Sequence, residues 1–259
     1  MTMRLAAVAG IFYPEEPQAL RQQVDGYLKD DCFSRNRPKA IVVPHAGFKY
    51  SAEIAASAYR LIKPLADRIE RVVLLGPAHR VALDGMALPE SERFATPLGE
   101  IDIDAPLVAS LRSLPQVTRS NSAHAQEHCI EVQLPFLQQL IPRFTILPLV
   151  VGRCTPQEVV EVLERVWGGD ETLLVFSSDL SHYLSYTQAR QTDSETCKQL
   201  CRLEGPLHGE QACGSYALNG LIEFSRNRGL HIDMLDLRNS GDTAGDKHRV
   251  VGYGAFAVY

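Results

Sequence analysis

Three histidines in this chain follow closely on short apolar runs of the kind that form buried strands. His45 comes directly after the run 40–44, and His79 and His182 follow similar runs. Runs rich in β-branched residues and bounded by Pro, Gly and Ser are typical of strands inside a parallel sheet. In open α/β sheets, ligands bind in the crevice outside the carboxyl ends of such strands. We therefore predict that the three imidazoles converge on one small site, either a metal centre or an acid/base centre.

His45 and His79 have the surroundings expected of metal ligands. Each lies near Gly and Pro residues that hold a tight turn. Neutral imidazole is the commonest protein ligand for first-row transition metals. The alternative is that each ring only hydrogen-bonds a neighbouring helix end, and finding the same placement twice counts against it.

Asp179 precedes His182 by three residues. On the first turn of a helix this spacing brings the two side chains together. The carboxylate would then fix the tautomer of the imidazole and raise its basicity, as it does for general bases and metal ligands. The alternative is that Ser178 or Asp179 only caps the helix.

Cys213 precedes a helix that we expect to begin near Gly214 and Ser215. Unpaired amides and the helix dipole at such a place lower the pKa of a thiol and make it available as a nucleophile or metal ligand. The alternative is a buried, inert thiol.

A rival constellation lies at residues 124–128, which read His-Ala-Gln-Glu-His. They match the H-x-x-E-H pattern of inverzincin peptidases, in which two histidines on one helix bind zinc and the glutamate acts as base. Short patterns of this kind arise by chance, however, and Pro135 would fall within the same helix. We regard the peptidase interpretation as the weaker one.

Strand-like and helix-like segments alternate along the chain, which predicts an α/β fold. We expect one domain over 1–259, with a mainly parallel central sheet flanked by helices. The clearest helix signal is Thr155-Pro156-Gln157-Glu158, a capping box with Pro at the first helical position. Strands at 145–151 and 172–176 would flank that helix in a β-α-β unit.

Four further elements are expected. They are a helix over 54–62, a helix near 218–222 that ends at 226–229, a surface excursion or hairpin at 89–106, and a closing strand at 249–259.

The bulk properties exclude several classes of protein. A formal net charge of −5 argues against a general nucleic-acid binder, which needs a basic face. No apolar stretch is long enough to span a bilayer, and we interpret the run at 5–12 as mature sequence rather than a signal peptide. The six cysteines form no CxxC motif and no disulfide framework. A reducing, cytoplasmic compartment fits best.

A series of short motifs also runs in order from about residue 7 to the C-terminus. They are 9–14 (AGIFYP), 43–51 (VPHAGFKYS), 75–79 (LGPAH), 127–136 (EHCIEVQLPF), 177–182 (SSDLSH), 240–242 (SGD) and 245–255. In order and coverage they resemble the Memo family (mediator of cell motility), and within it the microbial type called protein B of the AmmeMemoRadiSam system.

This resemblance implies a fold related to the type III extradiol ring-cleaving dioxygenases, which hold non-haem Fe(II) with two histidines and a carboxylate. In Memo proteins a cysteine stands in place of the carboxylate. Carried over by motif, His45 and His79 would be the imidazole ligands and Cys213 the third group. His182 would be the acid/base residue, with Asp179 near it.

The resemblance also places Phe12, Glu127 and His128 in the pocket wall or just behind the ligands. Phe12 falls where the human protein has a tryptophan, so this pocket would differ in shape.

The cysteine changes the chemistry that the resemblance implies. A thiolate is softer than a carboxylate and favours Cu(I), Zn(II) or thiolate-tolerant iron. It is also readily oxidised where dioxygen is activated. Catechol cleavage is therefore not inherited with the fold, because function belongs to the site. We expect a non-haem metal-dependent redox enzyme, dioxygenase-like, with iron or copper favoured and zinc possible.

Two alternatives stay open. One is a zinc hydrolase that uses the same site to activate water. The other is a non-enzymatic module that binds metal or a peptide. A small-molecule or peptide ligand is expected in each case, and the family resemblance adds radical-SAM and AMMECR1-like partner proteins. Nucleic-acid and membrane partners are not expected.

Overall fold

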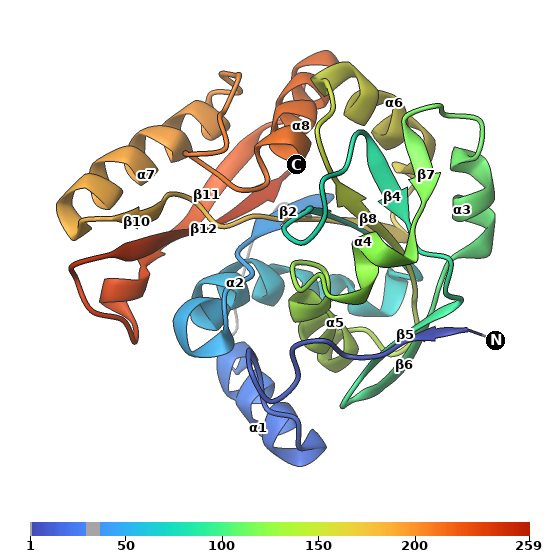
Figure 1. Cartoon of the computed structure of the whole chain (residues 1–259), viewed down its shortest axis with the longest axis horizontal. Coiled ribbons are helices and arrows are strands. Elements are labelled where there is room, and N and C mark those ends of the chain that lie inside the picture. Colours follow the sequence, from blue (N-terminus) through green and yellow to red (C-terminus); the bar gives the residue numbers. More distant parts are fainter. Residues whose placement is uncertain (1, 30–36) are drawn as a thin grey trace.

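The computed structural model describes residues 2–29 and 37–259. In this part of the chain a nine-stranded mixed sheet forms the centre, and helices cover both of its faces (Figure 1). The predicted α/β class with a central sheet flanked by helices is therefore confirmed, although the sheet also contains antiparallel pairs outside its parallel middle.

Four adjacent strands make up the parallel middle of the sheet. Their order is β2 (Ala40–Val43), β9 (Thr172–Ser177), β3 (Arg71–Pro77) and β8 (Thr145–Val151). Alternate residues of each strand enter different cores, so that Ile41 and Val43 pack on one face while Ala40 and Val42 pack on the other. A strand buried on both faces needs a continuous apolar run, which is why these strands were recognisable in the sequence.

Antiparallel pairings join the outer strands to this middle on both sides. On one side, β12 (Val250–Val258) pairs antiparallel with β2 and carries β11 (Ile232–Asn239) and β10 (His182–Leu184). On the other side, β4 (Met86–Leu88) is antiparallel to β8 and parallel to β7 (Val117–Arg119). The closing strand predicted at 249–259 is β12.

One face of the sheet packs against α1 (Pro17–Leu28), α2 (Phe48–Ile62) with the 3-10 turn η1 (Lys63–Arg68), and α5 (Leu134–Leu140). The predicted helical stripe at 54–62 belongs to α2. The rings of Tyr59 and Phe136 stack at 4.8 Å between α2 and α5. This contact joins α2 to α5.

The other face packs against α3 (Ala105–Leu111), α6 (Pro156–Val166), α7 (Tyr186–Cys201) and α8 (Ser215–Arg228). The capping box predicted for α6 is present, because Thr155 and Glu158 each bond the other's backbone N–H. Gly229 ends α8 in the left-handed conformation, with φ of 65°. Both ends lie where the sequence signals predicted them.

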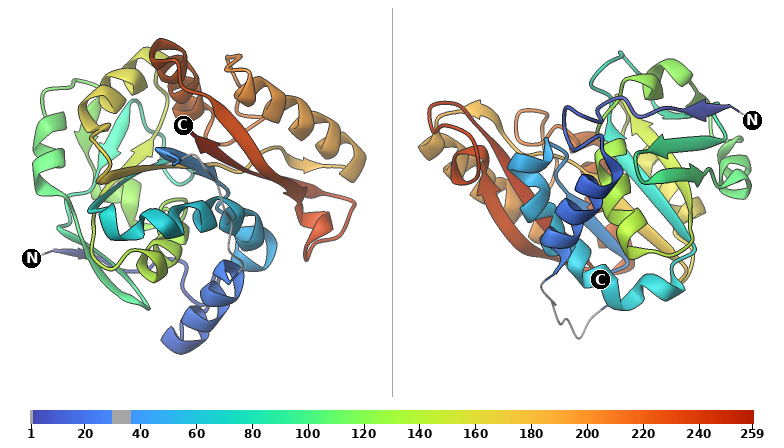
Figure 2. Two further views of the ribbon diagram at one scale, coloured as in Figure 1. Left: turned by 180° about the vertical axis from the view of Figure 1, so that it is seen from behind. Right: turned by 90° about the horizontal axis from the view of Figure 1, so that it is seen from below.

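The N-terminal strand β1 (Met3–Arg4) joins β5 (Arg93–Thr96) and β6 (Gly99–Asp102) in a small separate sheet. β5 and β6 form the hairpin expected within 89–106. This small sheet and the β10–β12 strands lie at opposite ends of the molecule (Figure 2). The short helices α4 (Asn121–Ala125), η2 (Glu131–Gln133) and η3 (Ser240–Asp242) lie in connections.

Five cysteines in the described residues are free thiols, and Cys32 lies outside the described residues. Within 2–29 and 37–259, no helix has both the length and the apolar character needed to cross a membrane.

Candidate metal centre

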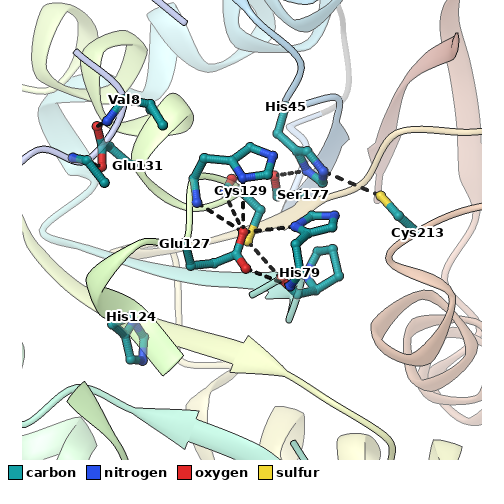
Figure 3. A network of polar contacts seen from close by, with 12 residues as sticks. Val8, His45, His79, His124, Glu127, Cys129, Glu131, Ser177 and Cys213 are labelled. Atoms are coloured by element: carbon teal, nitrogen blue, oxygen red, sulfur yellow. Dashed lines mark hydrogen bonds and ion pairs between the residues drawn. The ribbon is translucent and has the colours of Figure 1, made fainter. Parts of the chain in front are cut away.

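Three histidines meet beyond the carboxyl ends of β2 and β3. One ring nitrogen each from His45, His79 and His128 lies within 4.8 Å of the other two, and we call these three residues the imidazole group. The ring centroids are 4.7–5.4 Å apart. Figure 3 shows His45 and His79 side by side, with Glu127 next to His79 and Cys213 next to His45. His45 and His79 follow strands, while His128 comes from the loop after α4. Such a group could hold one metal ion.

Glu127 fixes the orientation of His79. Its Oε1 lies 2.8 Å from His79 Nδ1, and its Oε2 accepts the His79 backbone N–H at 2.6 Å. Oε1 also accepts the backbone N–H groups of His128 and Cys129. Burial alone would raise the pKa of Glu127, but its contacts with His79 dominate and lower it to about 2. An ionised carboxylate only accepts, so Nδ1 of His79 carries the proton and Nε2 is free to bind a metal.

Ser177 fixes the tautomer of His45 in the same way. Its hydroxyl donates its single proton to the Cys129 carbonyl at 2.6 Å and accepts a hydrogen from the Gln133 amide. The remaining contact, 2.9 Å to His45 Nδ1, must therefore be donated by the imidazole. Nε2 of His45 is therefore left without a proton and can act as a ligand atom. Burial lowers the pKa of His45 well below its ordinary value, so the ring is neutral at pH 7.

His128 completes the imidazole group with an unsatisfied nitrogen. Its Nδ1 is buried and has no hydrogen-bond partner among the described residues, although Glu127 Oε1 lies 3.3 Å away. Burial lowers the pKa of His128 to about 4, and the Phe12 ring packs at 4.9 Å. Buried polar atoms are rarely unpaired, so this nitrogen indicates a missing partner such as a metal ion or water.

Cys213 adjoins the imidazole group at His45. Its Sγ lies 3.4 Å from His45 Nε2 and accepts the Asp179 backbone N–H at 3.3 Å. The predicted helix after it is α8, with Gly214 as N-cap. Burial and then the Asp179 charge raise the pKa of Cys213 to about 12, opposite to the direction that its place before a helix predicts. Without a metal, the thiol therefore stays protonated.

Asp179 and His182 lie close to this group but not on a helix. The segment after β9 is irregular and His182 begins β10, so the predicted helical turn is wrong. Backbone bonds from Leu180 and Ser181 to Gly252 of β12 hold the segment in an extended path instead. Asp179 Oδ1 accepts the His45 backbone N–H at 2.7 Å. Burial raises the pKa of Asp179, while the charge of His182 is among the effects that lower it.

The H-x-x-E-H pattern is only partly realised. Because α4 ends at Ala125, His124 and His128 do not share a helix. His124 is buried, with Nε2 2.8 Å from the Ala87 carbonyl. Glu127 and His128, by contrast, both belong to the centre. The sequence predicted His128 in the pocket wall or just behind the ligands. The H-x-x-E-H pattern was the signal that could have marked it as an imidazole ligand.

Cys129 packs behind the centre. Its buried Sγ donates to the Pro77 carbonyl at 3.2 Å, and burial raises the pKa of the thiol. A Cβ on Gly76 would lie 2.5 Å from this sulfur, so only glycine lets β3 pass so close. The oxygen and sulfur atoms of Glu127 and Cys129 form a second group with His79 that could hold a metal. Their hydrogen bonds identify them instead as the support that positions His79.

Comparisons with known proteins agree on the family. The model of the Memo-like protein family matches residues 4–257. A MEMO1 family protein of Aquifex aeolicus is 35% identical over 266 residues, and the match covers 98% of each chain. One of Methanosarcina acetivorans is 36% identical over 276 residues and covers both chains fully.

A solved structure shows the same fold at low identity. It is the uncharacterized protein JW3007 from Escherichia coli K12, with a TM-score of 0.54 and 13% identity, covering 85% of this chain and 99% of that one. At this identity the likeness concerns the fold alone. The family model and the full-length relatives show that the chain belongs to the Memo family.

Proposed function

We propose that this chain is a non-haem metal-dependent redox enzyme that holds one transition-metal ion between His45, His79 and His128, with Cys213 as a further ligand. The observation that carries the proposal is the pair of hydrogen bonds at Nδ1 of His45 and His79. Each leaves the opposite ring nitrogen without a proton, within one small group. Hydrogen bonds that fix a tautomer in this way are typical of metal-ligating histidines.

The protonation states of the donors fit a metal. Metal ligands must bind without a proton. Burial lowers the pKa of both His45 and His128, which supplies neutral imidazoles at pH 7. The Nδ1 of His128 has no hydrogen-bond partner among the described residues, and a bound metal ion would supply one.

Cys213 supports redox chemistry over purely structural binding. Imidazoles suit iron, copper and zinc alike, whereas a thiolate favours Cu(I), zinc or iron–sulfur chemistry. A metal ion would deprotonate the nearby thiol despite its raised pKa. The N–H of Asp179 already donates to this sulfur and would stabilise the thiolate. When bound, iron or copper would supply the redox couple and an open position for a small molecule.

Asp179 and His182 would manage protons at the edge of the centre. Oδ1 of Asp179 is engaged by the His45 backbone, so Oδ2 is the atom on which a proton can be held. Burial favours the protonated carboxyl by raising its pKa. His182, half-buried at the start of β10, would exchange a proton between substrate and solvent. Partners of the radical-SAM and AMMECR1-like types are proposed from the family resemblance described above.

A specific observation favours a second candidate, a zinc hydrolase. Three imidazoles with an open fourth position are the ligand set of catalytic zinc sites that activate water. The imidazole group offers that set without Cys213.

The deciding measurement is the metal content of protein purified anaerobically without chelators or a histidine tag. Stoichiometric iron or copper supports the redox enzyme, and stoichiometric zinc supports the hydrolase. Protein that is folded, carries no metal and binds none on titration would overturn both. His45→Ala and His79→Ala should lose the metal while staying folded. His248→Ala, which changes an exposed histidine outside the imidazole group, is the matched control.

A further inference from the structure

A cleft of about 420 Å³ opens beside Cys213. Three parts of the chain line it: residues 77, 78 and 81–84 at and after the end of β3, the segment 151–153 at the end of β8, and Cys213 with Tyr216 at the start of α8. Because Cys213 Sγ lies 3.4 Å from His45 Nε2, the cleft adjoins the imidazole group at this residue. We call it the Cys213 cleft. Its volume suits a small molecule rather than a macromolecule.

Six residues of the lining have apolar side chains, which offer a ligand no hydrogen bonds. The apolar residues are Pro77, Ala78, Val81, Ala82, Leu83 and Val151. Two backbone hydrogen bonds join these segments, from Ala78 N to the Val151 carbonyl at 3.0 Å and from Arg153 N to the Leu83 carbonyl at 2.8 Å, and occupy those groups. The part of a ligand that lies against the six apolar side chains is therefore expected to be apolar.

The backbone geometry keeps this wall in place. A Cβ on Gly152 would lie 2.1 Å from the Leu83 carbonyl oxygen, so a glycine is required for the two segments to lie together. The close approach of these two segments therefore shapes this wall of the cleft.

Polar groups of the cleft lie at its exposed rim. Arg153 and Asp84 are exposed there, and Tyr216 is 41% exposed. Asp84 Oδ1 accepts a hydrogen bond from Arg153 Nε at 2.8 Å and lies 2.7 Å from Nη2 in the same ion pair. The hydrogen bond uses one of the five guanidinium hydrogens and holds the side chain in place. The remaining hydrogens and the tyrosine hydroxyl are free to donate to a carboxylate, which a guanidinium binds with directional hydrogen bonds.

We propose that the Cys213 cleft is the substrate pocket of the centre and takes a small molecule with an apolar body and one carboxylate, which Arg153 and Tyr216 bind at the rim. The apolar body reaches inward toward Cys213 and the imidazole group. This assignment rests on the proposed function for the identity of the reacting centre, but the binding preference can be measured without any turnover.

The test compares two probes of the same shape, 3-phenylpropionate and its primary amide. Their dissociation constants are measured by ligand-observed NMR titration on the full chain. The carboxylate should bind at least tenfold more tightly than the amide. Arg153→Met should remove this difference, and Tyr216→Phe should reduce it. Arg226→Met, which changes an exposed arginine at the other end of α8, should leave it unchanged.

A second pair of variants tests the place of the apolar body. Leu83→Trp fills the cleft from a half-buried position, and Ala82→Trp does so from an exposed one that the fold tolerates more easily. Each folded variant should lose binding of both probes by tenfold or more. Equal affinities for acid and amide in the unaltered chain, or unchanged binding in both tryptophan variants, would overturn the proposal.

Metal titration of the same proteins separates this proposal from the proposed function. If the protein binds no metal but still prefers the acid through Arg153, the metal centre is ruled out and the pocket is supported. If the protein binds metal but shows no preference for the acid over the amide, the pocket is ruled out and the metal centre is supported.

Discussion

The Glu127 carboxylate accepts the Nδ1 hydrogen of His79 at 2.8 Å and so leaves the Nε2 of that ring free for a metal. The same carboxylate binds the backbone of His79 at 2.6 Å. One side chain thus fixes the position, the tautomer and the basicity of a ligand that is otherwise exposed.

Replacing Glu127 with glutamine should therefore weaken metal binding by about 10- to 100-fold, as loss of a partner behind a ligating histidine does elsewhere. Glutamine keeps the shape but loses the charge that holds the proton on His79 Nδ1. The measurement is competitive titration of the metal against a chelator. Glu164→Gln on the exposed face of α6 is the control. An affinity equal in both variants would rule out this role for Glu127.

Ser177→Ala should lower both stability and metal affinity, because the hydroxyl joins three partners. Its loss leaves the Cys129 carbonyl, a Gln133 amide hydrogen and the His45 Nδ1 hydrogen without their bonds in the interior. Buried groups left unpaired cost about 1–3 kcal/mol each before relaxation, so we expect a loss of about 2 kcal/mol or more in the free energy of unfolding.

Urea denaturation with and without metal measures the Ser177 effect. The exposed Ser113→Ala should change neither quantity. A Ser177→Ala protein with unaltered unfolding would mean that the three partners find other bonds.

The elements that position the centre could be predicted because their signals are local. The Thr155 capping box and the continuous apolar runs of β2, β3 and β9 depend on residues adjacent in the sequence. Each forms a helix end or a strand buried on two faces whatever the rest of the chain does. His45 and His79 were recognisable because they directly follow such strands.

The residues whose position or protonation state the sequence did not predict are held by partners far away in the chain. His128 and Glu127 lie in an irregular loop, and the contact that defines Glu127 is made 48 residues away in the chain. Asp179 lies off a helix because Gly252, far along the chain, pairs with the backbone of its segment. The thiol of Cys213 precedes a helix as expected, but burial reverses the direction of its pKa shift. No local pattern carries this information.

Gly76→Ala should destabilise the protein by about 1–3 kcal/mol, the usual cost of overpacking a core. The new methyl group would lie 2.5 Å from Cys129 Sγ inside the support of His79. In a double-mutant cycle, Cys129→Ala should relieve part of the Gly76→Ala cost, because the two positions are in contact.

Thermal and urea unfolding of the four proteins gives the coupling free energy of Gly76 and Cys129. Gly26→Ala on α1 is the matched control, since a Cβ there meets nothing within 4 Å. It should be neutral or stabilising, because alanine is the better helix former by about 0.5–1 kcal/mol. Strictly additive effects of Gly76→Ala and Cys129→Ala would contradict the contact.

Asp193 on α7 should make the protein less stable as the pH rises from 4 to 7. Its carboxylate accepts the Ser181 N–H and is enclosed by Gly252, where a Cβ would lie 2.0 Å from Oδ2. Burial raises the pKa of Asp193 from 3.8 to about 6. Between these values the native carboxyl keeps a proton that the unfolded chain has lost, so the free energy of unfolding falls with rising pH. A shift of this size corresponds to about 3 kcal/mol above pH 6.

Asp193→Asn should remove this slope, because the amide oxygen still accepts the Ser181 N–H and carries no charge to desolvate. The difference in the free energy of unfolding between the variant and the original protein should be small at pH 4 and grow in favour of the variant toward pH 8. Urea titrations at four pH values measure it, with the exposed Asp67→Asn as the control. If both variants showed the same pH dependence as the original protein, the burial of Asp193 would have no part in setting stability.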